Sequence, residues 1–252
     1  MDRLVFTSHS AITELAVERQ ALVNELANVS TVGFKRSFDV ALRSIKVDGP
    51  GFDTRYQTQA VARDVIDLQP GALMMTGRPM DIAMQGKTVM GVQSSAGELA
   101  FSRRGDLRLN AQGVLEDGSG HMVMGQGGPI TAPAGFHVNI NPDGTVYASN
   151  PGQPNAAPVQ IGQLMLRDAS EAQLVRRADG LYGPAGQPPG SDFTTGPKQP
   201  LVTPNALEGS NVNAIYAMTR LIDHSRSFEA QIRAIKEAKS LDESGATMLK
   251  NT

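Results

Sequence analysis

The spacing of apolar residues changes twice along this chain, and this change limits the folds that it can adopt. In residues 1–33, and again after residue 203, apolar side chains recur every three or four positions, which predicts amphipathic helices. In residues 71–202, short apolar runs alternate with turns rich in Gly, Asn and Pro, which predicts short antiparallel strands. The sequence therefore predicts an α+β fold, in which long N- and C-terminal helices flank a central, mostly antiparallel β domain.

These patterns divide the chain into four segments. We expect an N-terminal helical segment at 1–33, an extended connecting segment at 34–70, the β domain at 71–202 and a C-terminal helical segment at 203–252. Gly33 is suited to the left-handed backbone that ends a helix. Ser210, Asn211 and Asn213 are good N-cap residues for the second helix. Within the β domain, Asp143–Gly144 and Asp117–Gly118 are predicted to form hairpin turns.

Composition excludes several classes of function. A net charge of −2 and an isoelectric point near 6.1 argue against a protein that coats nucleic acid. No run of about 18 apolar residues is present, so we expect neither a cleaved signal peptide nor membrane insertion. The arginine pairs Arg103–Arg104 and Arg176–Arg177 are flanked by acidic residues, which predicts that they lie on a solvated surface.

The chain shows no pattern that supports catalysis. With no cysteine, it has neither disulfides nor thiolate chemistry. Its four histidines lack metal-ligand spacing, and we expect His224 to be an exposed polar residue of the second helix. Asp81, Glu98, Glu116 and Asp117 could supply paired glycosidase carboxylates, although turn formation explains Glu116 and Asp117 better. We therefore predict no catalytic, cofactor or metal site, and we keep a secreted β-domain binding protein or glycan-processing enzyme as the alternative.

Three stretches together resemble the axial-protein family of the bacterial flagellum, which comprises the rod and hook subunits. The stretches are ALVNELANVSTVGFKRS at 21–37, TGRPMDIAMQG at 76–86 and LEGSNVN at 207–213, the last followed by a helix with Arg226, Phe228 and Glu229. Each motif alone is moderately specific, but their order and spacing span essentially the whole chain.

The resemblance implies a structural subunit of the flagellar basal-body rod. It favours the proximal rod, with the distal rod as the alternative. It also implies export by the flagellar type III apparatus, polymerisation with itself and other rod proteins across the periplasm, and transmission of torque. In this family, the terminal segments form a coiled-coil-like inner part when subunits stack.

This resemblance suggests which residues form the assembly interface. We hypothesise that leucines of the first helix contact apolar residues of the second, and that asparagines set the register between helices as a buried Asn does in coiled coils. Helix-end capping by the asparagines and an intramolecular core pair of the two helices are the alternatives. The predicted interface residues are Leu15, Leu22, Asn24, Leu26, Asn28, Asn211, Asn213, Ile215, Met218, Ile222, Phe228 and Ile232.

Overall fold

The computed structural model describes residues 2–37, 41–46, 56–61, 65–153 and 155–250. These residues form two compact units, each built from separate stretches of chain. The helical unit comprises Met1–Ala27, Asp39–Arg63 and Asn213–Thr252, and the β unit comprises Asn28–Phe38 and Asp64–Val212. The predicted combination of helices with a central β domain is confirmed.

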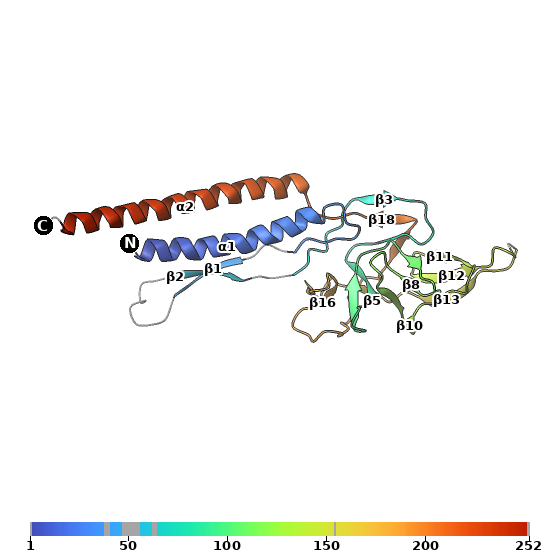
Figure 1. The fold of residues 1–252 in the computed structure, drawn as a ribbon. Helices are drawn as coiled ribbons and strands as arrows, with labels where there is room; N and C mark the ends of the chain where they lie inside the picture. The colour runs from blue at the N-terminus through green and yellow to red at the C-terminus, as the bar shows by residue number, and fades with distance from the viewer. Residues whose placement is uncertain (1, 38–40, 47–55, 62–64, 154, 251–252) are drawn as a thin grey trace. The chain divides into compact units, whose positions relative to one another are not determined.

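The helical unit contains both helices. Helix α1 spans Asp2–Ala27 and helix α2 spans Ala214–Lys250. They lie side by side and run in opposite directions, so α1 begins near the end of the pair where α2 finishes (Figure 1). A hairpin of β1 (Ala41–Lys46) and β2 (Tyr56–Val61) packs against α1 through β2.

The β unit is built from short antiparallel strands. Its largest sheet contains β5 (Thr88–Gln93), β6 (Leu99–Ser102), β7 (Arg108–Leu109), β8 (Leu115–Glu116), β9 (Met122–Gly125), β10 (Gly128–Pro129), β14 (Leu166–Asp168), β15 (Leu174–Arg176) and β16 (Tyr182–Pro184). The order is β15-β16-β6-β5-β9-β8-β7, with β14 paired to β5 and β10 paired to β9. All the described strand pairs are antiparallel, as predicted.

Three smaller sheets complete this unit. One contains β11 (His137–Ile140), β12 (Thr145–Ser149) and β13 (Val159–Gln163). The other two pair β4 (Ile82–Met84) with β17 (Val202–Pro204), and β3 (Leu73–Met75) with β18 (Ala206–Glu208). The C-terminal part of the chain therefore returns to strands formed about 120 residues earlier.

Turn chemistry explains why the strands end where they do. Between β11 and β12, Gly144 adopts φ 83°, and Asp143 accepts hydrogen bonds from the Thr145 backbone N–H and hydroxyl. Between β8 and β9, Asp117 accepts from the backbone N–H of Ser119 and of His121. Both predicted hairpin turns are confirmed, because a short acidic side chain can bond the backbone two residues on.

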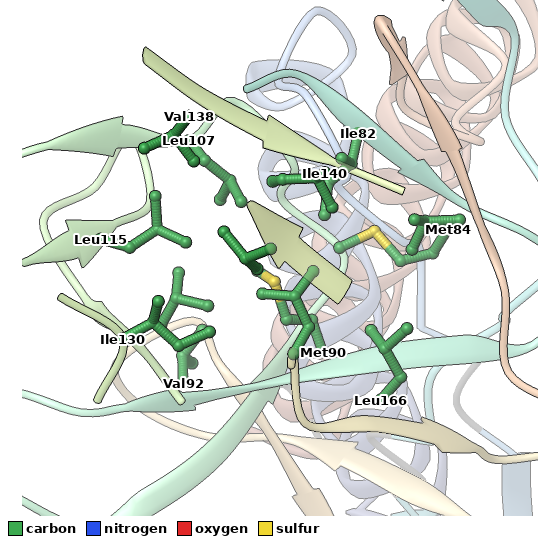
Figure 2. Packing of buried hydrophobic residues seen from close by; sticks show 14 of the residues in the cluster. Ile82, Met84, Met90, Val92, Leu107, Leu115, Ile130, Val138, Ile140 and Leu166 are labelled. Atoms are coloured by element: carbon green, nitrogen blue, oxygen red, sulfur yellow. The ribbon is translucent and has the colours of Figure 1, made fainter. Parts of the chain in front are cut away.

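Two clusters of buried side chains form the core of the β unit. In the larger one, side chains of Ile82, Met90, Leu115 and Ile140 from separate strands converge (Figure 2). The smaller one includes Phe101, whose ring meets that of Phe193 edge to face at 4.8 Å between centroids. The inward-facing residues of these strands fill the two clusters, which explains the short apolar runs in the sequence.

The four predicted segments do not coincide with the two units. Residues 28–33 and 203–212, which were grouped with the terminal helices, belong to the β unit. The connecting segment predicted at 34–70 contributes to both units, and its residues 38–40, 47–55 and 62–64 lie outside the described ranges. Strand pairing across long sequence separations decides these boundaries, and local periodicity does not contain that information.

Candidate subunit interface and buried ionic junction

Helix α2 presents small and polar side chains to α1. Ala217, His224, Gln231 and Ala238 recur every seven residues, and the first, second and last of these are 1%, 7% and 5% exposed. A seven-residue repeat keeps one face of a helix against a neighbouring helix. His224 Nε2 lies 3.1 Å from the Glu18 carboxylate of α1, so this face is the one that meets α1.

A polar cluster lies at the centre of this contact. Glu18 also accepts a hydrogen bond from Arg220, whose guanidinium lies 5.8 Å from the centre of the Tyr216 ring. His224 was expected to be exposed, and that prediction is wrong. The imidazole is only 7% exposed because it lies on the face of α2 that meets α1, beside the Glu18 carboxylate.

The opposite face of α2 is apolar and uncovered by the described residues. Ile215, Met218 and Ile222 are 79%, 51% and 54% exposed, and their spacing of three and four places them on one stripe. We call these three residues the α2 stripe. All three belong to the predicted interface, but they form no buried core with α1 in this chain.

The remaining apolar interface residues lie nearer the contact between the helices. Leu22 is 4% exposed, while Leu15, Leu26 and Ile232 are half-buried. Leu15 and Phe228 line a groove of about 550 Å³ between α1 and α2, and Phe228 is 44% exposed. The two helices thus leave apolar surface open along their shared groove.

The β unit contains a buried ionic junction at the Glu208 carboxylate. Oε1 accepts hydrogen bonds from Lys35 Nζ at 2.8 Å and from the Gly71 backbone N–H at 3.0 Å, and Oε2 accepts from Arg103 Nε at 2.8 Å. The side chains of Lys35 and Arg103 are 0% exposed and that of Glu208 is 3% exposed. We call Lys35, Arg103 and Glu208 the ionic junction.

Backbone carbonyls accept further hydrogen bonds from the two cations of the junction. Arg103 Nη1 donates to the carbonyls of Gly86 at 2.7 Å and Thr88 at 2.9 Å, and its Nη2 donates to that of Met84 at 2.8 Å. Lys35 Nζ also donates to the Gln69 carbonyl at 2.8 Å. Burial and the neighbouring Arg103 lower the pKa of Lys35, and Glu208 partly offsets them.

The prediction that the arginine pairs lie on a solvated surface is wrong for Arg103, which is fully buried. The other three arginines are partly buried and bond protein groups. Arg176 lies 4.3 Å from the centre of the Phe34 ring and donates to the Lys35 carbonyl. Arg104 donates hydrogen bonds through Nε and Nη2 to the two carboxylate oxygens of Asp106. Arg177 pairs with Glu98 at 2.6 Å. Flanking acids suggested solvation, whereas the partners of Arg103 and Arg176 lie far along the chain.

Gly33 occupies the tightest position beside the junction. Its φ is 68°, and a Cβ built there would lie 2.3 Å from the Arg103 carbonyl oxygen. Its backbone N–H donates to the Glu208 carbonyl at 2.7 Å, and its own carbonyl accepts from the Tyr182 hydroxyl at 3.3 Å. Only glycine fits here without displacing the backbone.

Comparisons with known proteins agree with this architecture. The family described as "Flagellar hook protein FlgE/F/G D1 domain" matches residues 83–148, and "Flagellar basal body rod FlgEFG protein C-terminal" matches residues 203–248. The flagellar basal-body rod protein FlgF of Salmonella typhimurium is 35% identical, with 93% of each chain covered. FlgF of Escherichia coli is 34% identical, and FlgG of Caulobacter vibrioides is 27% identical, over 93% of this chain in both cases.

The chain belongs to the FlgF family of flagellar basal-body rod proteins.

This FlgF-family chain is therefore a structural rod subunit of the flagellar basal body and not an enzyme, as the resemblance implied. Across the described ranges, no helix is both long and apolar enough to cross a membrane. Within the same ranges, no group of three His, Asp or Glu residues could hold a metal ion.

The structure gives the four predicted asparagines different surroundings. Asn213 caps α2, since its side-chain oxygen accepts from the Tyr216 backbone N–H at 3.1 Å. Asn28 lies in the turn after α1, where its side-chain oxygen accepts from the Thr31 hydroxyl at 3.2 Å. Asn24 is exposed on α1. The register hypothesis remains a prediction for these three.

Asn211 does not begin α2, contrary to expectation. Its side-chain oxygen accepts from the Arg36 backbone N–H at 2.7 Å, and its amide nitrogen donates to the Asp67 carbonyl at 2.9 Å. It therefore joins three stretches of the β unit. An Asn next to a helix start satisfies a capping pattern equally well, so the sequence could not distinguish these two roles.

Two features of this FlgF-family chain were not predicted. The ionic junction was not predicted from the sequence, although two of its residues, Lys35 and Glu208, lie in the motif stretches. Strand β3 exposes Leu73, Met74 and Met75 at 56%, 44% and 71%. Three consecutive exposed apolar residues on a short strand are the signal that could have indicated this second surface.

Proposed function

We propose that this chain is a subunit of the proximal rod, where it polymerises with copies of itself and with other rod proteins to transmit torque from motor to hook. The observation that carries the proposal is the exposed α2 stripe. The similarity of this chain to FlgF proteins over nearly its whole length supports the proximal position. A distal rod subunit is the second candidate, because FlgG proteins are also similar over nearly the whole length.

The α2 stripe supplies a driving force for assembly. Fully burying an aliphatic side chain of this size stabilises a contact by roughly 1.5–3 kcal/mol. Ile215, Met218 and Ile222 are all more than half exposed, so a neighbouring subunit that covers them gains most of this stabilisation. Leu73 and Met75 on β3 offer a second apolar surface of the same kind.

The proposed interface joins the stripe to the open groove between the helices. Leu15, Leu26, Phe228 and Ile232 keep part of their surface accessible, whereas Leu22 is already covered within the chain. In the assembled rod, these helices form a coiled-coil-like inner part. The seven-residue repeat of α2 supports this arrangement, because such repeats maintain contact along supercoiled helices.

The route to the rod is part of the same proposal. The chain is exported through the flagellar type III apparatus and assembles in the rod across the periplasm.

Serine substitution of the stripe tests the proposal. The variant Ile215→Ser/Met218→Ser/Ile222→Ser, expressed in a strain that lacks the wild-type gene, is expected to abolish motility. Electron microscopy of its basal bodies should show incomplete rods. Circular dichroism of the isolated variant should match that of wild type, because the replaced side chains are already exposed.

The matched control is Val159→Ser on β13, which removes an apolar side chain that is 60% exposed outside the stripe. It should preserve motility. A motile triple variant with complete rods would refute the proposed interface. Basal bodies of the deletion strain distinguish the two candidates, because loss of a proximal subunit stops assembly earlier than loss of a distal one.

A further inference from the structure

We propose that the Glu208 carboxylate makes docking of the N-terminal segment 28–37 and of the C-terminal segment 201–212 one cooperative event, so that the β unit holds both segments or neither. The coupling is a property of the isolated chain and does not depend on the proposed function. It assigns a role to a buried ion cluster that rod membership alone does not explain.

The Glu208 carboxylate connects the two segments directly. Glu208 bonds Lys35 and the Gly71 backbone N–H through one oxygen and Arg103 through the other, so four separate stretches of chain meet at a single carboxylate. Lys35 follows α1 by eight residues in the sequence, and Glu208 precedes α2 by six. The chain on the β-unit side of each helix is therefore held at the same point.

The charge of the junction couples the two segments further. The junction contains two cations and one anion, and all three side chains are at most 3% exposed. Without the carboxylate, Lys35 and Arg103 would face each other as buried cations with no anion bonded to them. A buried charge that loses its partner is strongly unfavourable, whereas release of its segment to water removes the penalty.

The remaining contacts of the N-terminal segment replace this carboxylate only weakly, because Asp67 raises the pKa of Lys35 less than Glu208 does. Arg176 donates to the Lys35 carbonyl and Tyr182 donates to the Gly33 carbonyl, but neither group supplies negative charge. The Gly33 backbone N–H donates to the Glu208 carbonyl itself. Loss of the C-terminal segment thus removes both the anion and a backbone acceptor from the N-terminal segment.

The coupling also acts in the reverse direction. If segment 28–37 leaves, Glu208 loses the Lys35 ammonium, and Asn211 loses the Arg36 backbone N–H that donates to its side chain. The Asn211 backbone N–H also loses the Phe34 carbonyl, to which it donates at 3.3 Å. Each segment therefore depends on bonds that only the other provides, which is the condition for reciprocal coupling.

Hydrogen exchange of the full-length chain tests the proposal. Glu208→Gln should raise exchange at the Asp67 amide, which bonds the Arg36 carbonyl and does not touch Glu208. Conversely, Lys35→Met should raise exchange at the Gly209 amide, which bonds the Ala72 carbonyl and does not touch Lys35. The increase in Glu208→Gln should be about 100-fold or more, because this change leaves two buried cations without their anion. The increase in Lys35→Met should be smaller, because Arg103 still pairs with Glu208.

Two controls make the result specific. Amides of the β11–β12–β13 sheet should keep their protection in both variants, because no residue of that sheet bonds the junction. Glu98→Gln removes a carboxylate paired with Arg177 that is 38% exposed, and it should leave both reporter amides unchanged.

If Glu208→Gln does not fold, Lys35→Met and the shorter-chain Glu208→Asp carry the same measurement. An increase at the distant reporter in either variant supports the coupling. Exchange that rises only beside the substituted residue, with the distant reporter unchanged, overturns it.

Discussion

Replacing Gly33 with alanine should destabilise the β unit far more than its backbone angle alone requires. Gly33 adopts φ 68°, and a Cβ there would lie 2.3 Å from the Arg103 carbonyl oxygen and 2.7 Å from the Arg104 nitrogen. The nearest atoms belong to backbone, so no side chain can rotate away to make room. The segment must instead move off the strands that hold it.

The expected cost has two parts. A left-handed backbone conformation costs a residue with a Cβ roughly 1–2 kcal/mol. Moving the segment also weakens the hydrogen bond from the Gly33 N–H to the Glu208 carbonyl and disturbs the ion pair between Lys35 and Glu208, which adds roughly 2–3 kcal/mol. We expect a total loss in the free energy of unfolding of about 3–5 kcal/mol.

Gly77→Ala is the matched control. Gly77 adopts φ 74°, within 6° of Gly33, but no atom lies within 4 Å of the position that a Cβ would take. It should therefore lose only the roughly 1–2 kcal/mol that the backbone angle costs. Urea unfolding of both variants, followed by far-UV circular dichroism, measures the difference directly.

Equal losses of stability in Gly33→Ala and Gly77→Ala would refute the predicted clash at Gly33. Equal losses would mean that the close approach of Gly33 to Arg103 carries no free energy and that only the backbone angle matters. A small loss in both would further mean that the positive φ angles are relaxed at little cost.

Three further outcomes follow from the structure. Burial raises the pKa of Tyr182 to about 12, above its unfolded value of 10.0, so its contribution is complete below pH 10 and is lost as pH rises through 12. The free energy of unfolding should therefore fall by up to roughly 3 kcal/mol over that interval, and less in Tyr182→Phe, as measured by urea titration at each pH. Ala217→Leu should push α1 away from α2 and lower the free energy of unfolding by roughly 1–3 kcal/mol, because Ala217 is only 1% exposed. The control Met218→Leu should change the melting temperature of the helices little, because Met218 is 51% exposed. Asn213→Ala should destabilise the first turn of α2 by about 1 kcal/mol, because it removes the cap. Faster hydrogen exchange at the Tyr216 amide would show this, and unchanged protection there would contradict the assigned cap.

Local features of the fold were predictable wherever the physical cause is local. The turn at Asp143–Gly144 follows from short-range hydrogen bonding and a positive φ, both of which a few neighbouring residues determine. Helical spacing at the two ends likewise identified α1 and α2, since one turn of helix places residues three and four apart on one face. Resemblance across several motifs then pointed to the flagellar family.

The direction in which a helix faces required the structure. The stripe of large apolar residues on α2 suggested a buried face, yet α1 contacts His224, and Ala217 and Ala238 of the same seven-residue repeat are the buried positions. Close approach of two helices favours small side chains at the contact, and this preference is invisible to a count of hydrophobic residues. The residues with the strongest hydrophobic signal are consequently those left exposed.

The sequence by itself determined the element types, the hairpin turns and the rod family, because neighbouring residues and motif order carry that information. Only the tertiary structure decided the ionic junction. Lys35 and Glu208 lie 173 positions apart, and Arg103 and Glu208 lie 105 apart, so no local pattern relates them. Flanking acids even suggested that Arg103 was solvated, because the carboxylate that binds it arrives from the far end of the chain.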